Sequence, residues 1–341
     1  MDHRAGPQGV RLGDANASRI GPRYLLATGA GLALGLLTLL AVLGGLGATG
    51  HLPPPAIANS LCIDEKLSFL RDHAPAHANL LVAGSSVAWR HAAGGVLAAL
   101  SGMAPFNVGF CGLNVAQSAD VIGWMHKRYR SVERVLLLIA PPDFARCTGQ
   151  PAWNLADADR YVFERAPKWP YYLRYFDPIS LVRNATQVHD KRSNRTPLDP
   201  LLFTEYGDGP LDTDRSDDLN FGPVYALDTR CFSALHGLAD SLSSSRVELM
   251  VVISPIHPDW KARYDADGQV TRRFAREVAS SLHGTRATLW NSDDGSPFAA
   301  SEFTDALHLR WSAVQRFSRM LAAQLSPRAT TSRSARPASA S

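Results

Sequence analysis

Three side chains in two distant parts of the chain are of the types that nucleophilic catalysis uses. Asp305 lies three residues before His308, a spacing that allows a carboxylate to hold an imidazole in the tautomer of a general base. Ser86 lies far upstream and is the candidate nucleophile. Each residue also has a structural interpretation, because Ser and Asp often cap helices and His often lies on a surface. Together they predict a Ser-His-Asp triad, provided that the fold brings them together.

A short apolar strand must position Ser86. The run from Asn79 to Ala83 ends just before Gly84, and a helix-like stretch to Leu100 follows, which predicts the serine at the carboxyl end of a parallel strand. Backbone N–H groups at the start of that helix would stabilise an oxyanion. Arg90, one turn further, is a candidate for binding an anionic group of a substrate, although a solvated arginine is the simpler interpretation.

Two further features follow other predicted strands. A loop with Gly109 and Gly112 suits either a close approach of its backbone to a substrate or a turn that needs positive φ. His257 is expected to reach the cleft, where it would bind substrate or compete with His308 as the base. His308 is favoured because Asp305 stands at the spacing that fixes its tautomer.

The positions of apolar runs predict the fold that holds these residues. Short uncharged runs alternate with helix-like segments over residues 79–326, which is typical of a doubly wound α/β domain with a mainly parallel sheet of about five strands. The predicted strands end near Ala83, Asn107, Ala140, Ile253 and Trp290, and the predicted helices include Ala58–His73, Ala116–Arg130 and one that begins with a capping box at Ser312–Gln315.

Residues 146–230 interrupt this alternation. The segment is rich in aromatic residues, Asp, Pro and Arg, and it is too long for a simple crossover. We predict an insertion over the open end of the sheet, with at least one helix, at about residues 178–189. Ordinary packing is the simpler explanation of its aromatic side chains; the alternative is that some of them line a carbohydrate groove.

An uncharged segment at residues 24–50 is long enough to span a bilayer. The alternative is a signal peptide, whose apolar part is usually shorter, roughly 7 to 15 residues. Arginines precede the segment, whereas the first basic residue beyond it is Lys66, so residues 1–23 are expected in the cytoplasm. The linker and leading helix at 51–78, the α/β domain and a disordered tail at 327–341 are then expected outside the inner membrane.

Composition excludes some other classes. The net charge of +4 is small for 341 residues, and the basic residues are scattered, which argues against nucleic-acid binding. The four cysteines form no CxxC pair and have no His at metal-ligand spacing, so no metal site is expected. They are either paired or free, and an oxidising compartment outside the cytoplasm would permit disulfides.

Four blocks of the sequence resemble those of the SGNH (GDSL-type) hydrolase superfamily. They are Gly84-Ser85-Ser86, the loop from Asn107 to Gly112, Ala140-Pro141-Pro142-Asp143 and Asp305-Ala306-Leu307-His308. The layout is similar to that of membrane-anchored members that modify bacterial cell-surface polymers, such as the D-alanine transfer protein of teichoic acid synthesis and the alginate acetylation proteins. The resemblance implies a flavodoxin-like fold with Ser86 as nucleophile, Gly112 in the oxyanion hole, His308 as base and Asp305 as its partner. This chemistry needs no metal or organic cofactor.

Two positions depart from the family pattern. Ser85 replaces the usual Asp of the first block, and Pro142 stands where the family has the asparagine of the oxyanion hole. Proline has neither an amide side chain nor an N–H, and the loss of one such donor typically costs about a hundredfold or more in rate. Asn114, two residues beyond Gly112, is a candidate substitute, in addition to the backbone at Ser86.

The sequence thus predicts an inner-membrane-anchored serine esterase or O-acyltransferase that acts on acyl esters of a cell-surface polysaccharide. The expected partners are the polymer, the membrane and a membrane acyltransferase or export complex. The alternative is a catalytically impaired SGNH-like module that binds polysaccharide or scaffolds such a complex. A third candidate is a regulatory membrane protein whose aromatic insertion binds a partner.

Overall fold

The computed structural model describes residues 21–193, 199–211, 219, 222–223 and 226–325. The chain forms two compact units, residues 1–52 and residues 53–341. In the first unit, α1 at Pro22–Ala48 is 27 residues long, and the side chains of its most apolar window are exposed. About 20 apolar residues cross the hydrocarbon core of a bilayer, so α1 has the length and composition of a membrane span. The predicted C-terminal tail and most of the predicted N-terminal tail lie outside the described residues.

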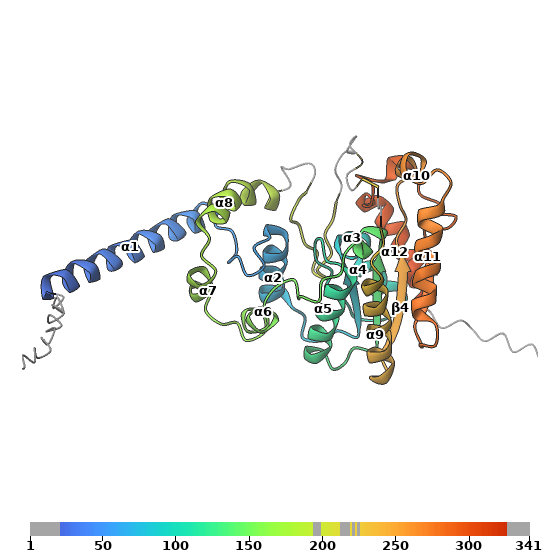
Figure 1. The fold of residues 1–341 in the computed structure, drawn as a ribbon, viewed down its shortest axis with the longest axis horizontal. Coiled ribbons are helices and arrows are strands. Elements are labelled where there is room, and N and C mark those ends of the chain that lie inside the picture. Colours follow the sequence, from blue (N-terminus) through green and yellow to red (C-terminus); the bar gives the residue numbers. More distant parts are fainter. Residues whose placement is uncertain (1–20, 194–198, 212–218, 220–221, 224–225, 326–341) are drawn as a thin grey trace, which may run out of the picture. The chain divides into compact units, whose positions relative to one another are not determined.

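A parallel sheet of five strands forms the centre of the second unit (Figure 1). The strand order is β2-β1-β3-β4-β5, and the strands are β1 Leu80–Gly84, β2 Pro105–Asn107, β3 Arg134–Ile139, β4 Glu248–Ile253 and β5 Thr288–Asn291. The chain adds β2 on one side of β1 and then β3 on the other, so the order of the strands reverses beside β1. In open α/β sheets this switch point is where ligands bind, at the carboxyl ends of the strands. The predicted α/β fold is confirmed.

Helices cover both faces of the sheet because successive side chains of a strand point to opposite faces. On one face Leu80, Val82 and Leu138 pack with one group of helices, whereas Leu81 and Leu137 pack with another group on the other face. The main helices of the first face are α3 Ser86–His91, α4 Gly94–Ser101 and α12 Trp311–Leu325; those of the second are α5 Val115–Arg128, α9 Thr229–Ser244 and α11 Gln269–Leu282. The leading helix, α2 at Leu61–His73, adds its apolar side chains to the second face.

The helix predicted from Ser86 to Leu100 is in fact two helices, α3 and α4. The break occurs because backbone N–H groups at the junction have side-chain partners elsewhere in the chain: Ala93 N–H donates to Ser318 Oγ of α12, and Gly94 N–H donates to the carboxylate of Asp208. The predicted capping box at Ser312 is also wrong. The helix α12 begins one residue earlier, and the N–H of Trp311 donates to the carbonyl of Leu211.

Within its described residues the insertion forms three helices, in agreement with the prediction of at least one. These are α6 Leu155–Val162, α7 Trp169–Arg174 and α8 Pro178–Arg192. Trp153, Tyr161 and Tyr171 are buried, which supports the packing explanation, but Trp169 and Phe176 are exposed. The remaining short elements are α10 Pro258–Tyr264 and the 3-10 helices η1 Pro141–Phe144 and η2 Ala300–Glu302. All four cysteines are paired, as Cys62–Cys111 and Cys147–Cys231.

Candidate active site

The strand β1 ends at Gly84, and Ser86 is the first residue of α3. Gly84 has φ +137°, and a Cβ on it would lie 2.2 Å from the carbonyl oxygen of Leu138 in β3. Only glycine therefore allows β1 to approach β3 so closely at this point. The chain then turns into α3, which places the half-buried Ser86 at the carboxyl edge of the sheet.

A tight turn between η2 and α12 carries His308. The turn closes through the N–H and the hydroxyl of Thr304, which both donate to the carbonyl of His308, at 2.8 and 3.1 Å. Asp305 accepts backbone N–H bonds from Leu307 and His308 with one carboxylate oxygen, both at 2.8 Å. The other carboxylate oxygen is thereby directed at the imidazole of the same turn.

The structure brings Ser86, His308 and Asp305 into one chain of hydrogen bonds. His308 Nε2 lies 2.9 Å from Ser86 Oγ, and His308 Nδ1 lies 2.8 Å from Asp305 Oδ2. Because the carboxylate of Asp305 only accepts, Nδ1 carries the proton, and Nε2 is left to accept from the serine hydroxyl. Burial alone would raise the pKa of Asp305, but the charge and hydrogen bond of His308 and the two backbone donors outweigh it and lower the pKa to about 2.

His91, at the end of α3, supports the turn from behind. Its Nε2 accepts the N–H of Leu309 at 2.9 Å, and its ring meets that of His308 edge-on. Burial, followed by the nearby charge of His308, lowers the pKa of His91 to about 3. The ring is therefore neutral near pH 7 and remains an acceptor. No sequence pattern singles out this residue, because a histidine five positions after the serine looks like any core histidine.

A second carboxyl group lies beside the serine pair. Asp143 in η1 accepts a hydrogen bond from Ser85 and another from the N–H of Ala140 at 2.9 Å. Shielding from water raises the pKa of Asp143 to about 7, against the opposing effect of these two bonds and of the charge of His308. Ser85, which replaces the usual Asp of the first block, thus connects the turn before the nucleophile to the end of β3.

The glycine-rich loop lies directly beside this turn. Phe110 N–H donates to the carbonyl of Gly84, and a Cβ on Gly109 would lie 2.6 Å from the backbone nitrogen of Trp89 in α3. Gly112 has φ +67°, and a Cβ there would meet no atom within 4 Å, so its backbone borders open space. The disulfide from Cys111 to α2 fixes the loop.

Asn114 caps α5. Its Oδ1 accepts the N–H of Gln117 at 2.9 Å, and the Gln117 side chain accepts the N–H of Asn114 at 3.2 Å. The cap uses the oxygen of the amide and leaves its NH₂ group as a potential donor. Pro142, by contrast, lies in η1 and offers no donor of its own.

The structure gives Arg90 and His257 internal contacts instead of the predicted role in substrate binding. Arg90 is buried over the ring of Trp89, and its guanidinium donates to the carbonyl oxygens of Pro200, Gly209 and Pro210. His257 is fully buried, caps α10 by accepting the N–H of Asp259 at 3.0 Å, and does not occupy the place of His308 beside the serine.

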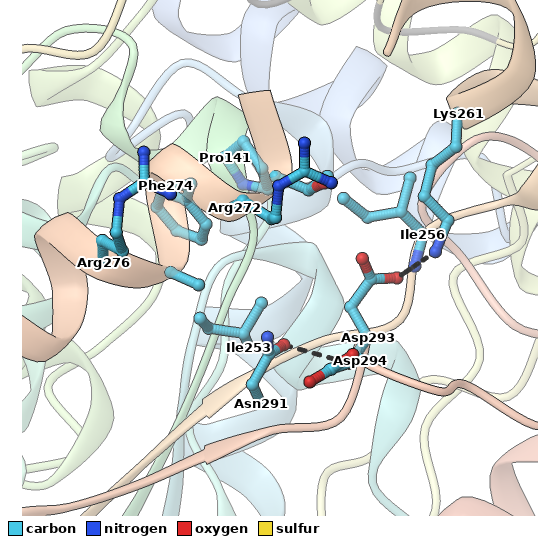
Figure 2. A pocket seen from close by; sticks show the side chains of 12 residues that line it. Pro141, Ile253, Ile256, Lys261, Arg272, Phe274, Arg276, Asn291, Asp293 and Asp294 are labelled. Carbon is cyan, nitrogen blue, oxygen red and sulfur yellow. Dashed lines mark hydrogen bonds and ion pairs between the residues drawn. The ribbon is translucent and has the colours of Figure 1, made fainter. Parts of the chain in front are cut away.

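A pocket of about 430 Å³ opens where β3, β4 and β5 end, and its lining residues do not include Ser86, Asp305 or His308. Figure 2 shows Arg272 and Arg276 of α11 along one side and Lys261 of α10 paired with Asp293 on the other. Pro141, the first residue of η1, also lines it. Within the described residues, no group of three or more His, Cys, Asp or Glu side chains is arranged to hold a metal ion.

Comparison with known proteins gives distant structural matches. No family model matches the chain, and no curated protein matches it. Among solved structures, a protein described as a "putative arylesterase" from Agrobacterium tumefaciens str. C58 is 13% identical, with a TM-score of 0.37 over 72% of this chain and 97% of that one. The inhibitor-bound aryl esterase of M. smegmatis is 12% identical, with a TM-score of 0.34 and the same coverage.

Proposed function

We propose that the chain is a serine hydrolase or acyltransferase that cleaves acyl esters and belongs to the SGNH superfamily. The single observation that carries the proposal is the position of His308, whose two ring nitrogens lie within hydrogen-bond distance of Ser86 and Asp305. A serine activated in this way is a nucleophile toward carbonyl carbon. Its place at the switch point of a parallel sheet is also where such folds bind ligands.

The reaction follows from the hydrogen bonds. Ser86 Oγ attacks the acyl carbon while His308 Nε2 accepts the hydroxyl proton, and Asp305 stabilises the imidazolium that forms. His308 then donates this proton to the oxygen of the leaving alcohol, which leaves the acyl group on Ser86. Water or a second hydroxyl attacks the acyl-enzyme while His308 accepts its proton; the bond between the acyl carbon and Ser86 Oγ then breaks, and His308 returns the proton to Ser86 Oγ. Water as acceptor gives an esterase, and a sugar hydroxyl gives a transferase.

The oxyanion would be stabilised by backbone N–H groups at Ser86 and Gly112 and by the side-chain NH₂ of Asn114. The open space at Gly112 and the unshared donor end of the Asn114 amide support this assignment. In this arrangement the amide of Asn114 supplies the donor that Pro142 lacks.

The proposed location is the outer side of the inner membrane. The length and composition of α1, the arginines before it and the two disulfides support a membrane anchor with the α/β unit in an oxidising compartment. An anchor suits an enzyme that works beside a membrane acyltransferase or export complex, so we propose an acylated cell-surface polysaccharide as the substrate. The pocket in Figure 2, with arginines along one side, would suit the acidic groups of such a polymer.

Labelling with a serine-directed fluorophosphonate tests the proposal. The full-length chain should take up the probe at Ser86, and S86A should take up none while keeping the same melting temperature. The rate of aryl acetate hydrolysis should correlate with the extent of labelling at Ser86. A folded wild-type protein that takes no label would favour the alternative, a catalytically impaired module that binds polysaccharide. The structural reason for this alternative is that Pro142 offers no hydrogen-bond donor.

A further inference from the structure

The insertion carries a stripe of exposed apolar side chains. Trp169 and Leu173 lie four residues apart in α7, and Ile179 and Val182 lie three residues apart in α8, so each pair shares one face of its own helix; Phe176 lies in the connection between the two helices. They are the large hydrophobic residues of this segment that remain exposed, and Ile179 and Val182 are 77% and 65% exposed. A soluble protein rarely leaves so many neighbouring apolar side chains in water without a use for them.

The stripe is tied to the residues that follow α1 in the chain. Tyr172, between Trp169 and Leu173, donates its hydroxyl to the carbonyl of Pro53 at 2.7 Å, and Ser180 donates to the side chain of Asn59 at 2.7 Å. Pro53 is five residues beyond the last residue of α1, a distance that an extended chain covers in at most about 18 Å. The insertion is therefore tethered close to any bilayer in which α1 is embedded.

The polar residues around the stripe suit lipid headgroups. Trp is the residue most typical of the interface between hydrocarbon and headgroups. Lys168, Arg174 and Arg183 are exposed beside the apolar side chains. The first two pair with Asp72 and Asp157, whereas Arg183 contacts only the neutral side chains of Ser180 and Asn184 among the described residues. Basic side chains around an apolar stripe favour a surface of anionic lipids.

We propose that this stripe lies in the headgroup region of the membrane that holds α1, so that the α/β unit rests on the bilayer and does not hang freely from its linker. The proposal goes beyond the catalytic function. It rests on the proposed anchoring by α1 but not on the triad. The occupant we assign is the lipid surface itself; a second copy of the chain or another protein would give a different result in the following experiment.

The experiment uses single added cysteines in the full-length chain, because all native cysteines are paired. An environment-sensitive NBD label is placed at I179C or V182C, and at L100C as the matched control, since Leu100 is an exposed leucine outside the insertion. The protein is reconstituted in vesicles of phosphatidylcholine and phosphatidylglycerol. Quenching is measured with a spin-labelled lipid and with aqueous iodide, and flotation verifies insertion.

The proposal expects the label at 179 or 182 to be quenched by the spin-labelled lipid, with iodide quenching about threefold weaker than at position 100. Equal access of iodide at positions 179 and 100 would overturn it. A label shielded from both quenchers would place a protein on the stripe and would also overturn it, as would failure of the chain to float with the vesicles. Fluorophosphonate labelling of the same samples reports separately on the catalytic proposal.

Discussion

The imidazole of His91 stands edge-on to that of His308, with ring centroids 6.1 Å apart, and holds the N–H of Leu309, the residue after the proposed base. Ser86 is the first residue of α3 and His91 is its last. Both side chains contact the turn that carries His308: Ser86 contacts His308 itself, and His91 contacts the N–H of Leu309. The helix that presents the serine therefore also positions its base.

His91→Phe should lower kcat/KM of aryl ester hydrolysis by about tenfold to a hundredfold, because it leaves the buried N–H of Leu309 without an acceptor and frees the His308 turn to shift. His91→Gln offers an amide oxygen and should recover much of the rate. The split between kcat and KM distinguishes positioning from general damage: the loss in His91→Phe should fall on kcat, with KM little changed. An equal loss in both variants would contradict this role.

Asp305→Asn should reduce kcat by about a thousandfold to ten-thousandfold, because the amide favours the wrong tautomer of His308. The Asn side-chain oxygen can still accept the N–H bonds of Leu307 and His308, so the turn and the melting temperature should change little. Steady-state kinetics combined with thermal unfolding measures both effects. A fully active Asp305→Asn enzyme would show that the carboxylate is only a structural part of the turn.

Substitutions of Asn114 can separate its role as the cap of α5 from its proposed role as a hydrogen-bond donor to the oxyanion. Asn114→Asp keeps an oxygen for the N–H of Gln117, and therefore the cap of α5, but removes the NH₂ donor. The rate should fall about a hundredfold with little loss of stability, whereas Asn114→Ala should lose the rate and about 1 kcal/mol of stability. Unchanged activity in Asn114→Asp, together with a faster Pro142→Asn enzyme, would instead locate the missing donor at Pro142.

Asp143 should make stability depend on pH between about 4 and 7. Its pKa is about 7 in the folded protein against 3.8 for an unperturbed Asp, so the folded state binds the proton more tightly. The free energy of unfolding should therefore fall as pH rises through this window and level off above it, by at most about 4 kcal/mol. Asp143→Asn cannot ionise and should show a shallower slope, because the buried Asp64, whose pKa is also raised to about 7, still titrates in this window. Urea unfolding at pH 4.5, 6 and 8 would measure the difference, and parallel slopes in both proteins would refute it.

The chain sequence predicts the sheet well because the physical signal is local. Uncharged runs such as Val135–Ile139 suit only strands covered on both faces, and the structure places them there. The residue types and spacing of Asp305 and His308, together with the strand before Ser86, were also enough to indicate which side chains should meet.

What the sequence does not predict depends on partners that are remote along the chain. The break between α3 and α4 is set by Asp208 and Ser318, each more than a hundred residues away. Arg90 appears in the sequence as a surface arginine, yet carbonyl groups of residues 200–210 bury it. His91 acquires its role only when Leu309 folds against it. No local pattern contains these pairings.

The disulfide between Cys62 and Cys111 has a consequence for when the protein can mature. Its second cysteine immediately precedes Gly112, so the loop that borders the serine is covalently fixed to α2 only once these thiols are oxidised. With the proposed topology, that happens after translocation. A chain still in the cytoplasm would carry the proposed triad but lack this brace, and so the proposed site would be completed only after translocation.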